Sequence, residues 1–247
     1  MGFVDIHSHI LPYMDDGAQD FDQALQMLDM AWEEGITHMI ATPHYKQGRY
    51  RADTQAVLQQ VEELQGMAQD QGIPVQIYPG TEVFYRGGLE EKLDRGKLWT
   101  LNGTEYVLVE FAPLEEYSYI RNAVDEMLGM GYKPVAAHVE RYRCFLRDAD
   151  RVRELKTMGC RIQVNSGSVA GEFGYLSGRF TRGLIQKELV DYLGTDAHDL
   201  NKRRPLMKKC AEFLLKKCSQ EYAYALLFGN AMTDLLPDES TDAEMDK

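Results

Sequence analysis

The sequence lacks several features that would point to particular protein classes. No stretch of its 247 residues approaches the roughly 20 apolar residues of a membrane-spanning helix. The first residues alternate apolar and polar at once, without a preceding basic region, so no signal peptide is expected. Basic residues are few: 27 lysines and arginines face 39 aspartates and glutamates, a net charge of −12. That balance argues against general binding to a nucleic acid backbone or an anionic membrane.

Cysteine is also scarce. The chain contains four, none of them in a Cys-x-x-Cys pair: Cys144, Cys160, Cys210 and Cys218. A disulfide framework is therefore not expected, and a reducing cytoplasm is the predicted location.

The sequence does contain a regular alternation of strand-like and helix-like segments. Seven strands are predicted, at residues 3–6, 36–42, 75–83, 106–111, 133–138, 161–165 and 189–194. Helices are predicted at residues 20–34, 53–71, 118–130, 149–158 and 179–187, with two more in 204–228 that pack on the outside. Repeated strand–helix units indicate an α/β fold with a parallel sheet or barrel, and seven strands indicate a distorted or incomplete barrel.

The pattern of apolar, polar and acidic residues also predicts the domain organisation and bears on assembly. Residues 1–236 are predicted to form one domain, and the acidic residues 237–247 a disordered tail. The apolar face of helix 20–34 fits either the core of one chain or a contact in a homo-oligomer, and the pattern leaves both open.

Histidines and carboxylates gather where the predicted strands end. In a parallel barrel these carboxyl ends lie on one face, where active sites are built. His7 and His9 have a spacing that lets both imidazoles meet one cation. His38, inside an apolar run, is interpreted as structural. The strand-end set is sufficient for more than one metal ion, with Asp15 or Asp16 added from the first loop: His7, His9, His44, Glu82, Glu110, His138, Asp196 and His198.

These residues lie in short blocks that are recognisable together. The blocks include Asp5-Ile6-His7-Ser8-His9, Thr42-Pro43-His44, Gly80-Thr81-Glu82, Val109-Glu110-Phe111, Ala137-His138-Val139-Glu140-Arg141-Tyr142, Gln163-Val164-Asn165 and Gly194-Thr195-Asp196-Ala197-His198. Jointly they resemble the polymerase-and-histidinol-phosphatase (PHP) superfamily and, within it, the bacterial capsule and exopolysaccharide protein-tyrosine phosphatases. The resemblance implies a distorted seven-stranded (β/α) barrel of the PHP type with three metal ions, usually manganese, sometimes iron or zinc.

The resemblance also implies a ligand set. One metal would be held by His7, His9, Glu82 and Asp196; Glu82 would bridge to a second, held by Glu110 and His138; the third would take Asp16, His44 and His198. Asp16 is favoured over its neighbour Asp15. Other members of the superfamily often have histidine in place of Glu110 and the loop aspartate, so this sequence shows an acidic version.

Two arginines complete the predicted site. Arg141 and Arg203 are expected in loops on the metal face, where a guanidinium can hold two phosphate oxygens, and Arg203 is favoured over Arg204. Bound metals would make hydroxide available near neutral pH and offset charge on the phosphoryl group. His198 or His44 could protonate the leaving oxygen. No cysteine belongs to a Cys-x5-Arg motif, which excludes the nucleophile of cysteine-dependent tyrosine phosphatases.

The sequence is compatible with three alternative functions. The first is a manganese-dependent phosphatase that acts on the tyrosine-rich tail of a bacterial tyrosine autokinase of polysaccharide export. The second is a histidinol-phosphate phosphatase or another small-molecule phosphomonoesterase of the same superfamily. The third is a non-catalytic regulator that binds the kinase. The mixed Asp/Glu ligand pattern and the Glu140-Arg141-Tyr142 block favour the first, and a complete ligand set argues against the third.

Overall fold

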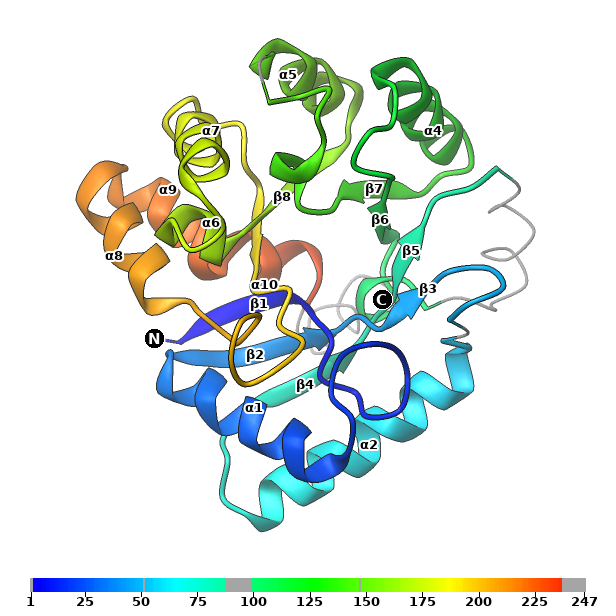
Figure 1. Ribbon diagram of the computed structural model, residues 1–247, viewed down its shortest axis with the longest axis vertical. Helices are drawn as coiled ribbons and strands as arrows, with labels where there is room; N and C mark the ends of the chain where they lie inside the picture. The colour runs from blue at the N-terminus through cyan, green and yellow to red at the C-terminus, as the bar shows by residue number, and fades with distance from the viewer. Residues whose placement is uncertain (1, 51, 88–98, 147, 237–247) are drawn as a thin grey trace, which may run out of the picture.

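Parallel strands form the centre of the molecule (Figure 1). The computed structural model describes residues 2–50, 52–87, 99–146 and 148–236. In these residues, a three-stranded sheet has the order β1-β2-β4 and a six-stranded sheet the order β3-β5-β6-β7-β8-β9. The strands are β1 (Phe3–Ser8), β2 (Ile36–Ala41), β3 (His44–Tyr45), β4 (Gln76–Pro79), β5 (Glu82–Phe84), β6 (Tyr106–Glu110), β7 (Lys133–Ala136), β8 (Arg161–Asn165) and β9 (Tyr192–Gly194).

Helices cover the sheets from outside. In Figure 1, α1 and α2 lie along the smaller sheet, and α4, α5 and α7 along the larger one. The helices are α1 (Phe21–Glu33), α2 (Thr54–Asp70), α4 (Tyr117–Gly129), α5 (Ala149–Met158), α6 (Ser166–Ala170), α7 (Tyr175–Gln186), α8 (Lys208–Lys217), α9 (Gln220–Tyr224) and α10 (Asn230–Asp234), with short 3-10 turns at Leu101–Gly103 and Val139–Arg141 and a π turn at Ala225–Gly229. None of the helices described is both long and apolar enough to cross a membrane.

The two sheets together form a curled layer, in which β1, an edge strand of the smaller sheet, meets β9, an edge strand of the larger one. Ser8 forms a parallel bridge with Ala197 just beyond β9. The Asp196 N–H donates to the His7 carbonyl at 2.8 Å, and the His9 N–H donates to the Ala197 carbonyl at 2.9 Å. These bonds hold the carboxyl ends of β1 and β9 together. The result is a mixed α/β fold with a curled parallel sheet.

Capping and apolar patterning explain α1. The side chain of Asp20 accepts a hydrogen bond from the Gln23 N–H, which satisfies a free donor of the first turn. The side chains of Ala24, Leu28 and Ala31 on its apolar face are fully buried. Of the two roles left open for this face, the structure therefore assigns it to the core of one chain.

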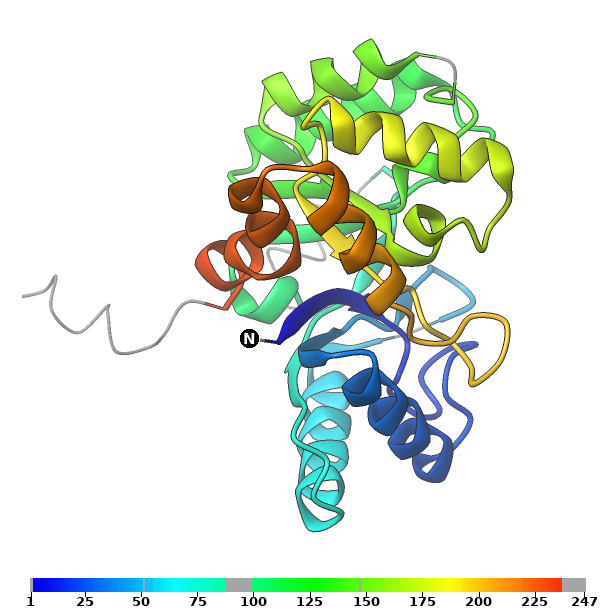
Figure 2. The same cartoon turned by 90° about the vertical axis from the view of Figure 1, so that its left-hand side faces the viewer.

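The C-terminal helices differ from their prediction. The two helices predicted in 204–228 are present as α8 and α9, but the chain then continues from α9 through the π turn into α10, which was not predicted. Ala231 and Leu235 of this last part belong to a buried cluster with Val4 of β1 and Tyr106 of β6. Figure 2 shows α8 to α10 beside β1. α10 and the residues directly after it thus pack into the interior near the amino ends of the strands.

Other predicted elements are confirmed with shifted boundaries. Helix 149–158 and strand 161–165 occur where they were predicted. The predicted strand 75–83 is two strands, β4 and β5, because Gly80 and Thr81 interrupt it, and α7 begins four residues before the predicted 179. The predicted acidic tail, 237–247, lies outside the described residues.

Candidate metal centre

The strand-end histidines and carboxylates converge on one face. His7 lies inside β1, because this strand runs two residues further than predicted, and His9 follows it. The loops after β1 and β9 close over this edge of the strands. The other strands place their residues at the same edge: His44 from β3, Glu82 from β5, Glu110 from β6, His138 after β7, and Asp196 and His198 after β9. The shared edge of parallel strands therefore brings the predicted residues together.

Glu82 lies at the centre of the cluster. Its Oε1 is 3.3 Å from His7 Nε2 and 2.9 Å from His138 Nε2. Its Oε2 is 3.3 Å from His9 Nε2 and 2.8 Å from His44 Nδ1. One buried carboxylate thus faces four imidazoles, which come from the ends of three strands, β1, β3 and β7.

Asp196 completes the first group. Its Oδ1 is 3.6 Å from His7 Nε2 and 3.4 Å from His9 Nε2, and these two ring nitrogens are 3.1 Å apart. Four donor side chains therefore surround one small space.

Glu110 and Asp16 lie at the two ends of the cluster. Glu110 Oε1 is 3.7 Å from His138 Nε2. Asp16 Oδ1 is 3.5 Å from His44 Nε2 and 4.0 Å from His198 Nε2. The second and third predicted groups are therefore also brought together.

Asp15 and Asp16 have different surroundings. Asp16 is half exposed and faces His44 and His198. Asp15 is buried; its Oδ2 is 2.7 Å from His9 Nδ1 and accepts the His44 N–H at 2.7 Å, while its Oδ1 accepts the Gly17 N–H. A Cβ on Gly17 would come within 2.0 Å of the His9 carbonyl oxygen, so only glycine fits this loop. Asp15 thus orients His9 from behind, and Asp16 presents a free oxygen to the site.

The predicted arginines both contact Asp196. Arg141 Nη2 is 2.5 Å from Asp196 Oδ2, and Arg203 Nη2 is 2.8 Å from Asp196 Oδ1. Both arginine side chains are about one-third exposed, at 35% and 31%. Arg204 is exposed. Arg203 is therefore the residue of this pair that reaches the cluster.

Gln163 supports the cluster from β8. Its Oε1 accepts the His138 N–H at 2.7 Å and is 3.3 Å from His7 Nδ1. Its Nε2 donates to Asn165 Oδ1 at 3.0 Å, and Asn165 Nδ2 donates to Asp196 Oδ2 at 2.9 Å. A Cβ on Gly194 would lie 2.5 Å from His7 Cβ and 2.8 Å from Gln163 Nε2, so a glycine allows β9 to approach this closely.

Asp5 ties β1 to β9 beneath the cluster. Its carboxylate accepts the Thr195 N–H at 2.9 Å and the Thr195 hydroxyl at 2.5 Å. Burial raises the pKa of Asp5 to about 6, although these bonds act in the other direction.

Two residues of the cluster have a left-handed backbone conformation, with φ of +32° at His138 and +54° at Asp196. Such conformations are costly for residues with a side chain and are typical of functional sites.

The charges of the cluster are strongly coupled. Burial alone would raise the pKa of Glu82, but His7 and His44 hold it well below its ordinary value. Burial likewise opposes ionisation of Asp196, yet Arg141 and His7 keep its pKa well below the usual range. Burial and the Glu82 charge raise the pKa of Glu110 to about 7. Burial and Arg141 lower the pKa of His138 to about 4, so its imidazole is neutral at pH 7.

These residues fit divalent cations. His198 Nε2 is buried without a hydrogen-bond partner among the described residues, as expected of a nitrogen that keeps its lone pair for a metal. Three groups of residues each offer ligand atoms that lie within 4.8 Å of one another inside the group. The groups are His7, His9 and Glu82; His44, Glu82 and Glu110; and His9, His44 and His198. Imidazole with carboxylate suits zinc, iron or manganese.

The supporting residues were missed at the level of sequence. The sequence predicts Asp15 only as an alternative ligand and assigns no role to Gln163 or Asn165. Asn165 ends β8, so a strand-end rule that includes amides as well as histidines and carboxylates identifies it. His38 lies elsewhere, with its ring 6.1 Å from Tyr78 and 6.0 Å from Phe228.

Known proteins resemble this chain along most of its length. The family model described as capsular polysaccharide synthesis, CpsB/CapC, matches residues 3–236. The tyrosine-protein phosphatase YwqE of Bacillus subtilis is 34% identical over 223 residues, which cover 90% of this chain and 88% of the relative. The tyrosine-protein phosphatase CpsB of Streptococcus agalactiae serotype V is 28% identical over 237 residues, covering 94% of this chain and 98% of the relative.

A solved structure is similar in three dimensions. It comes from crystal structures of YwqE from Bacillus subtilis and CpsB from Streptococcus pneumoniae, described as unique metal-dependent tyrosine phosphatases. It superposes with a TM-score of 0.88 at 33% sequence identity and covers 94% of each chain.

Proposed function

Because the chain belongs to the capsular polysaccharide synthesis CpsB/CapC family, we propose that it is a metal-dependent protein-tyrosine phosphatase of capsular or exopolysaccharide biosynthesis. The observation that carries the proposal is the arrangement of four histidines around the buried carboxylate of Glu82, with two arginines on Asp196 beside it. Relatives that are named tyrosine-protein phosphatases support the substrate class.

Three metal ions are proposed, with manganese as the first candidate and iron or zinc as alternatives. The first would be held by His7, His9, Glu82 and Asp196; the second by Glu82, Glu110 and His138; the third by Asp16, His44 and His198. Support comes from the distances between these donors and from His198 Nε2, which has no hydrogen-bond partner in the part of the chain that the structure describes. Bound there, the ions would lower the pKa of water and offset phosphoryl charge.

The protein's own groups would bind and orient the phosphate. Arg141 and Arg203 approach the cluster from its rim, and a planar guanidinium suits two phosphoryl oxygens. Tyrosine leaves with a pKa of about 10, so little general-acid assistance is needed. We propose His198 or His44 for that limited role. His44 is part-exposed, with 17% of its side chain accessible, so it can meet the leaving oxygen.

The wider setting is also proposed. The substrate would be the tyrosine-rich tail of a bacterial tyrosine kinase of polysaccharide export, and the four free cysteines favour a reducing cytoplasm. Residues 1–236 would form one domain. The interrupted pairs β2/β3 and β4/β5, each counted as one strand, favour a distorted seven-stranded barrel of the PHP type. Homo-oligomers are compatible with this scheme.

The decisive experiment is a substrate panel. A phosphotyrosine peptide, a phosphoserine peptide and histidinol phosphate are compared after chelation and after manganese is restored. We expect hydrolysis only with metal, and the highest kcat/KM with phosphotyrosine. A roughly tenfold advantage for histidinol phosphate, or about 1.4 kcal/mol of transition-state preference, would assign the chain to the small-molecule phosphatases instead.

A further inference from the structure

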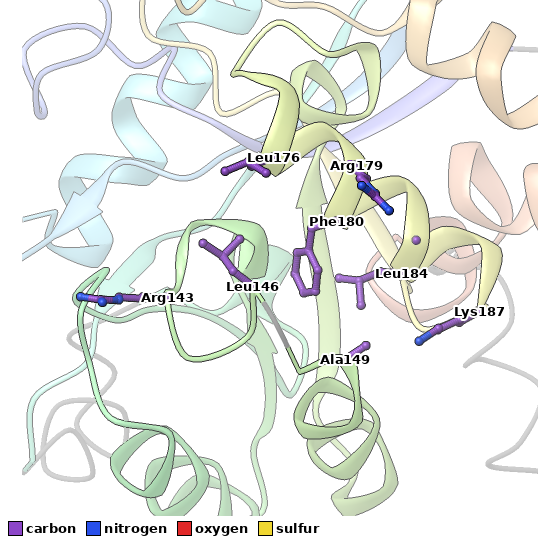
Figure 3. A pocket seen from close by; sticks show the side chains of 9 residues that line it. Arg143, Leu146, Ala149, Leu176, Arg179, Phe180, Leu184 and Lys187 are labelled. Carbon is purple, nitrogen blue, oxygen red and sulfur yellow. The ribbon is translucent and has the colours of Figure 1, made fainter.

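A second concave site lies outside the metal centre, between α7 and the segment that leads into α5. Its volume is about 570 Å³, within the range of ligand sites. Figure 3 shows Leu146, Phe180 and Leu184 facing into it. We call it the α5–α7 groove; none of its lining residues belongs to the proposed metal or phosphate site.

The groove exposes apolar side chains. Leu176 is 76% exposed and Leu146 is 37% exposed, and Phe180 between them is only partly buried. Scattered exposed leucines need no explanation, but here they line one concavity with an aromatic ring at its centre. An apolar side chain of another molecule could pack against this exposed apolar surface.

Positive charge surrounds this apolar surface. Arg143, Arg179 and Lys187 line the groove, and none forms an ion pair with any residue that the structure describes. Two acids of the neighbouring segments are themselves paired elsewhere, Asp148 with Arg151 at 3.1 Å and Glu172 with Lys209 at 2.8 Å. On a chain of net charge −12, a group of unpaired cations around an apolar floor favours an acidic ligand.

The groove adjoins the metal face through the chain itself. Arg143 follows Arg141, which contacts Asp196, by two residues. On the other side, β8 ends at Asn165, which also contacts Asp196, and the chain then passes through α6 into α7. The two segments that line the groove therefore both start beside residues that contact Asp196 at the proposed phosphate site.

We propose that the α5–α7 groove binds an acidic peptide segment with an aliphatic or aromatic anchor, adjacent to the phosphotyrosine of the same substrate. The anchor lies against Leu146, Leu176 and Phe180, and the acidic side chains meet Arg143, Arg179 and Lys187. This inference rests on the proposed function and adds to it a reason for peptide selectivity.

The test compares the wild type with the double variant Arg179→Glu/Lys187→Glu. Substrates are a phosphotyrosine peptide rich in aspartate, glutamate and leucine, the same peptide with serine at the acidic positions, and free phosphotyrosine. We expect KM for the acidic peptide to rise about tenfold while kcat is retained, because rim charges act on encounter and binding. Values for free phosphotyrosine should not change. Leu176→Ser should raise KM for both leucine-containing peptides.

The matched control is Arg153→Glu/Lys216→Glu. It makes the same change in net charge at exposed positions outside the groove, where the side chains are 52% and 72% exposed. Equal KM values for the groove variant and this control would overturn the inference, because long-range charge alone would then explain the effect.

Direct binding separates this inference from the proposed function. Fluorescence anisotropy with the unphosphorylated acidic peptide needs no catalysis, and we expect a similar loss of affinity in the groove variant only. That result supports the groove even if no phosphotyrosine is hydrolysed, in which case the proposed function alone fails. Binding to phosphatidylglycerol vesicles, or self-association, that the groove variant abolishes while peptide binding is unchanged would overturn the inference.

Discussion

Arg141 and Asp196 form an ion pair of 2.5 Å beside the proposed metal site, and Arg203 holds the other carboxylate oxygen at 2.8 Å. The same carboxylate lies 3.4 Å from His9 and is a proposed metal ligand. The oxygen that faces His7 and His9, Oδ1, is the one that Arg203 contacts, whereas Arg141 contacts Oδ2. The proposed first metal and the two arginines proposed to bind phosphate therefore share one carboxylate.

The first prediction concerns these arginines. Arg141→Ala or Arg203→Ala removes a charge-assisted contact to phosphate, worth ~1.5–3 kcal/mol. In the metal-loaded protein, kcat/KM should therefore fall about ten- to hundredfold, mostly through kcat if the contact strengthens in the transition state. Steady-state kinetics and metal analysis on the same samples check this.

Arg204→Ala is the control for that experiment, because Arg204 is exposed next to Arg203. It should leave both kinetics and metal content near the wild-type values. Loss of metal in Arg141→Ala would make this arginine structural, and full activity in both variants would remove the phosphate contact from the scheme.

The second prediction concerns Glu82, whose two oxygens face His7, His9, His44 and His138. Glu82→Ala leaves these imidazoles without their shared carboxylate, so more than one metal should be weakened. We expect bound metal to fall by at least one ion and kcat/KM by more than about a hundredfold. Glu82→Gln keeps the volume and serves as the comparison. Wild-type turnover in Glu82→Ala would exclude a bridging role.

The positions of the predicted ligands could be read from the sequence because one rule applies to all of them. His44, Glu82 and Glu110 follow apolar runs, and the carboxyl ends of parallel strands meet on one face whatever the details of the sheet. The resemblance to capsule phosphatases is confirmed by the family model. What the residues do at that face stays a prediction.

Features that depend on packing could not be read in the same way. Asp15 and Asp16 are neighbours with the same side chain, and only the fold of the loop turns one toward His9 and the other toward His44. By contrast, the break between β4 and β5 falls at Pro79-Gly80, a turn signal that the sequence itself contains. The interior position of α10 could not be predicted, because an amphipathic pattern shows that one face of a helix is buried but not which part of the protein that face packs against.

The third prediction is a pH dependence of the metal-free protein. Burial and Glu82 raise the pKa of Glu110 from its ordinary 4.5 to about 7, so the folded chain holds this proton more tightly than the unfolded chain. The stabilisation from the proton is fully present below pH 4.5 and is lost as pH rises to about 7. The loss amounts to about 3 kcal/mol at most.

Denaturant unfolding of the wild type and Glu110→Gln across this pH range, both with chelator, isolates the effect. The free energy of unfolding should fall more steeply for the wild type, because the amide does not titrate. Added manganese should reverse the trend, since a cation favours the ionised carboxylate. Parallel pH curves for the two proteins would contradict the assignment to Glu110.

The last prediction concerns Gln163, which accepts the His138 N–H at 2.7 Å and lies 3.3 Å from His7 Nδ1. An acceptor at Nδ1 favours the tautomer of His7 that directs the Nε2 lone pair toward Glu82 and Asp196, as is common for metal-bound histidines. Gln163→Met keeps the volume but removes that acceptor, so metal affinity measured by calorimetry should fall about ten- to hundredfold. Gln163→Glu keeps the acceptor but replaces the donor to Asn165 with a carboxylate oxygen at a buried position, so its affinity should lie between those of Gln163→Met and the wild type. Because both variants alter the same buried position, equal affinities in the two would mean that packing, and not orientation of His7, is what Gln163 contributes.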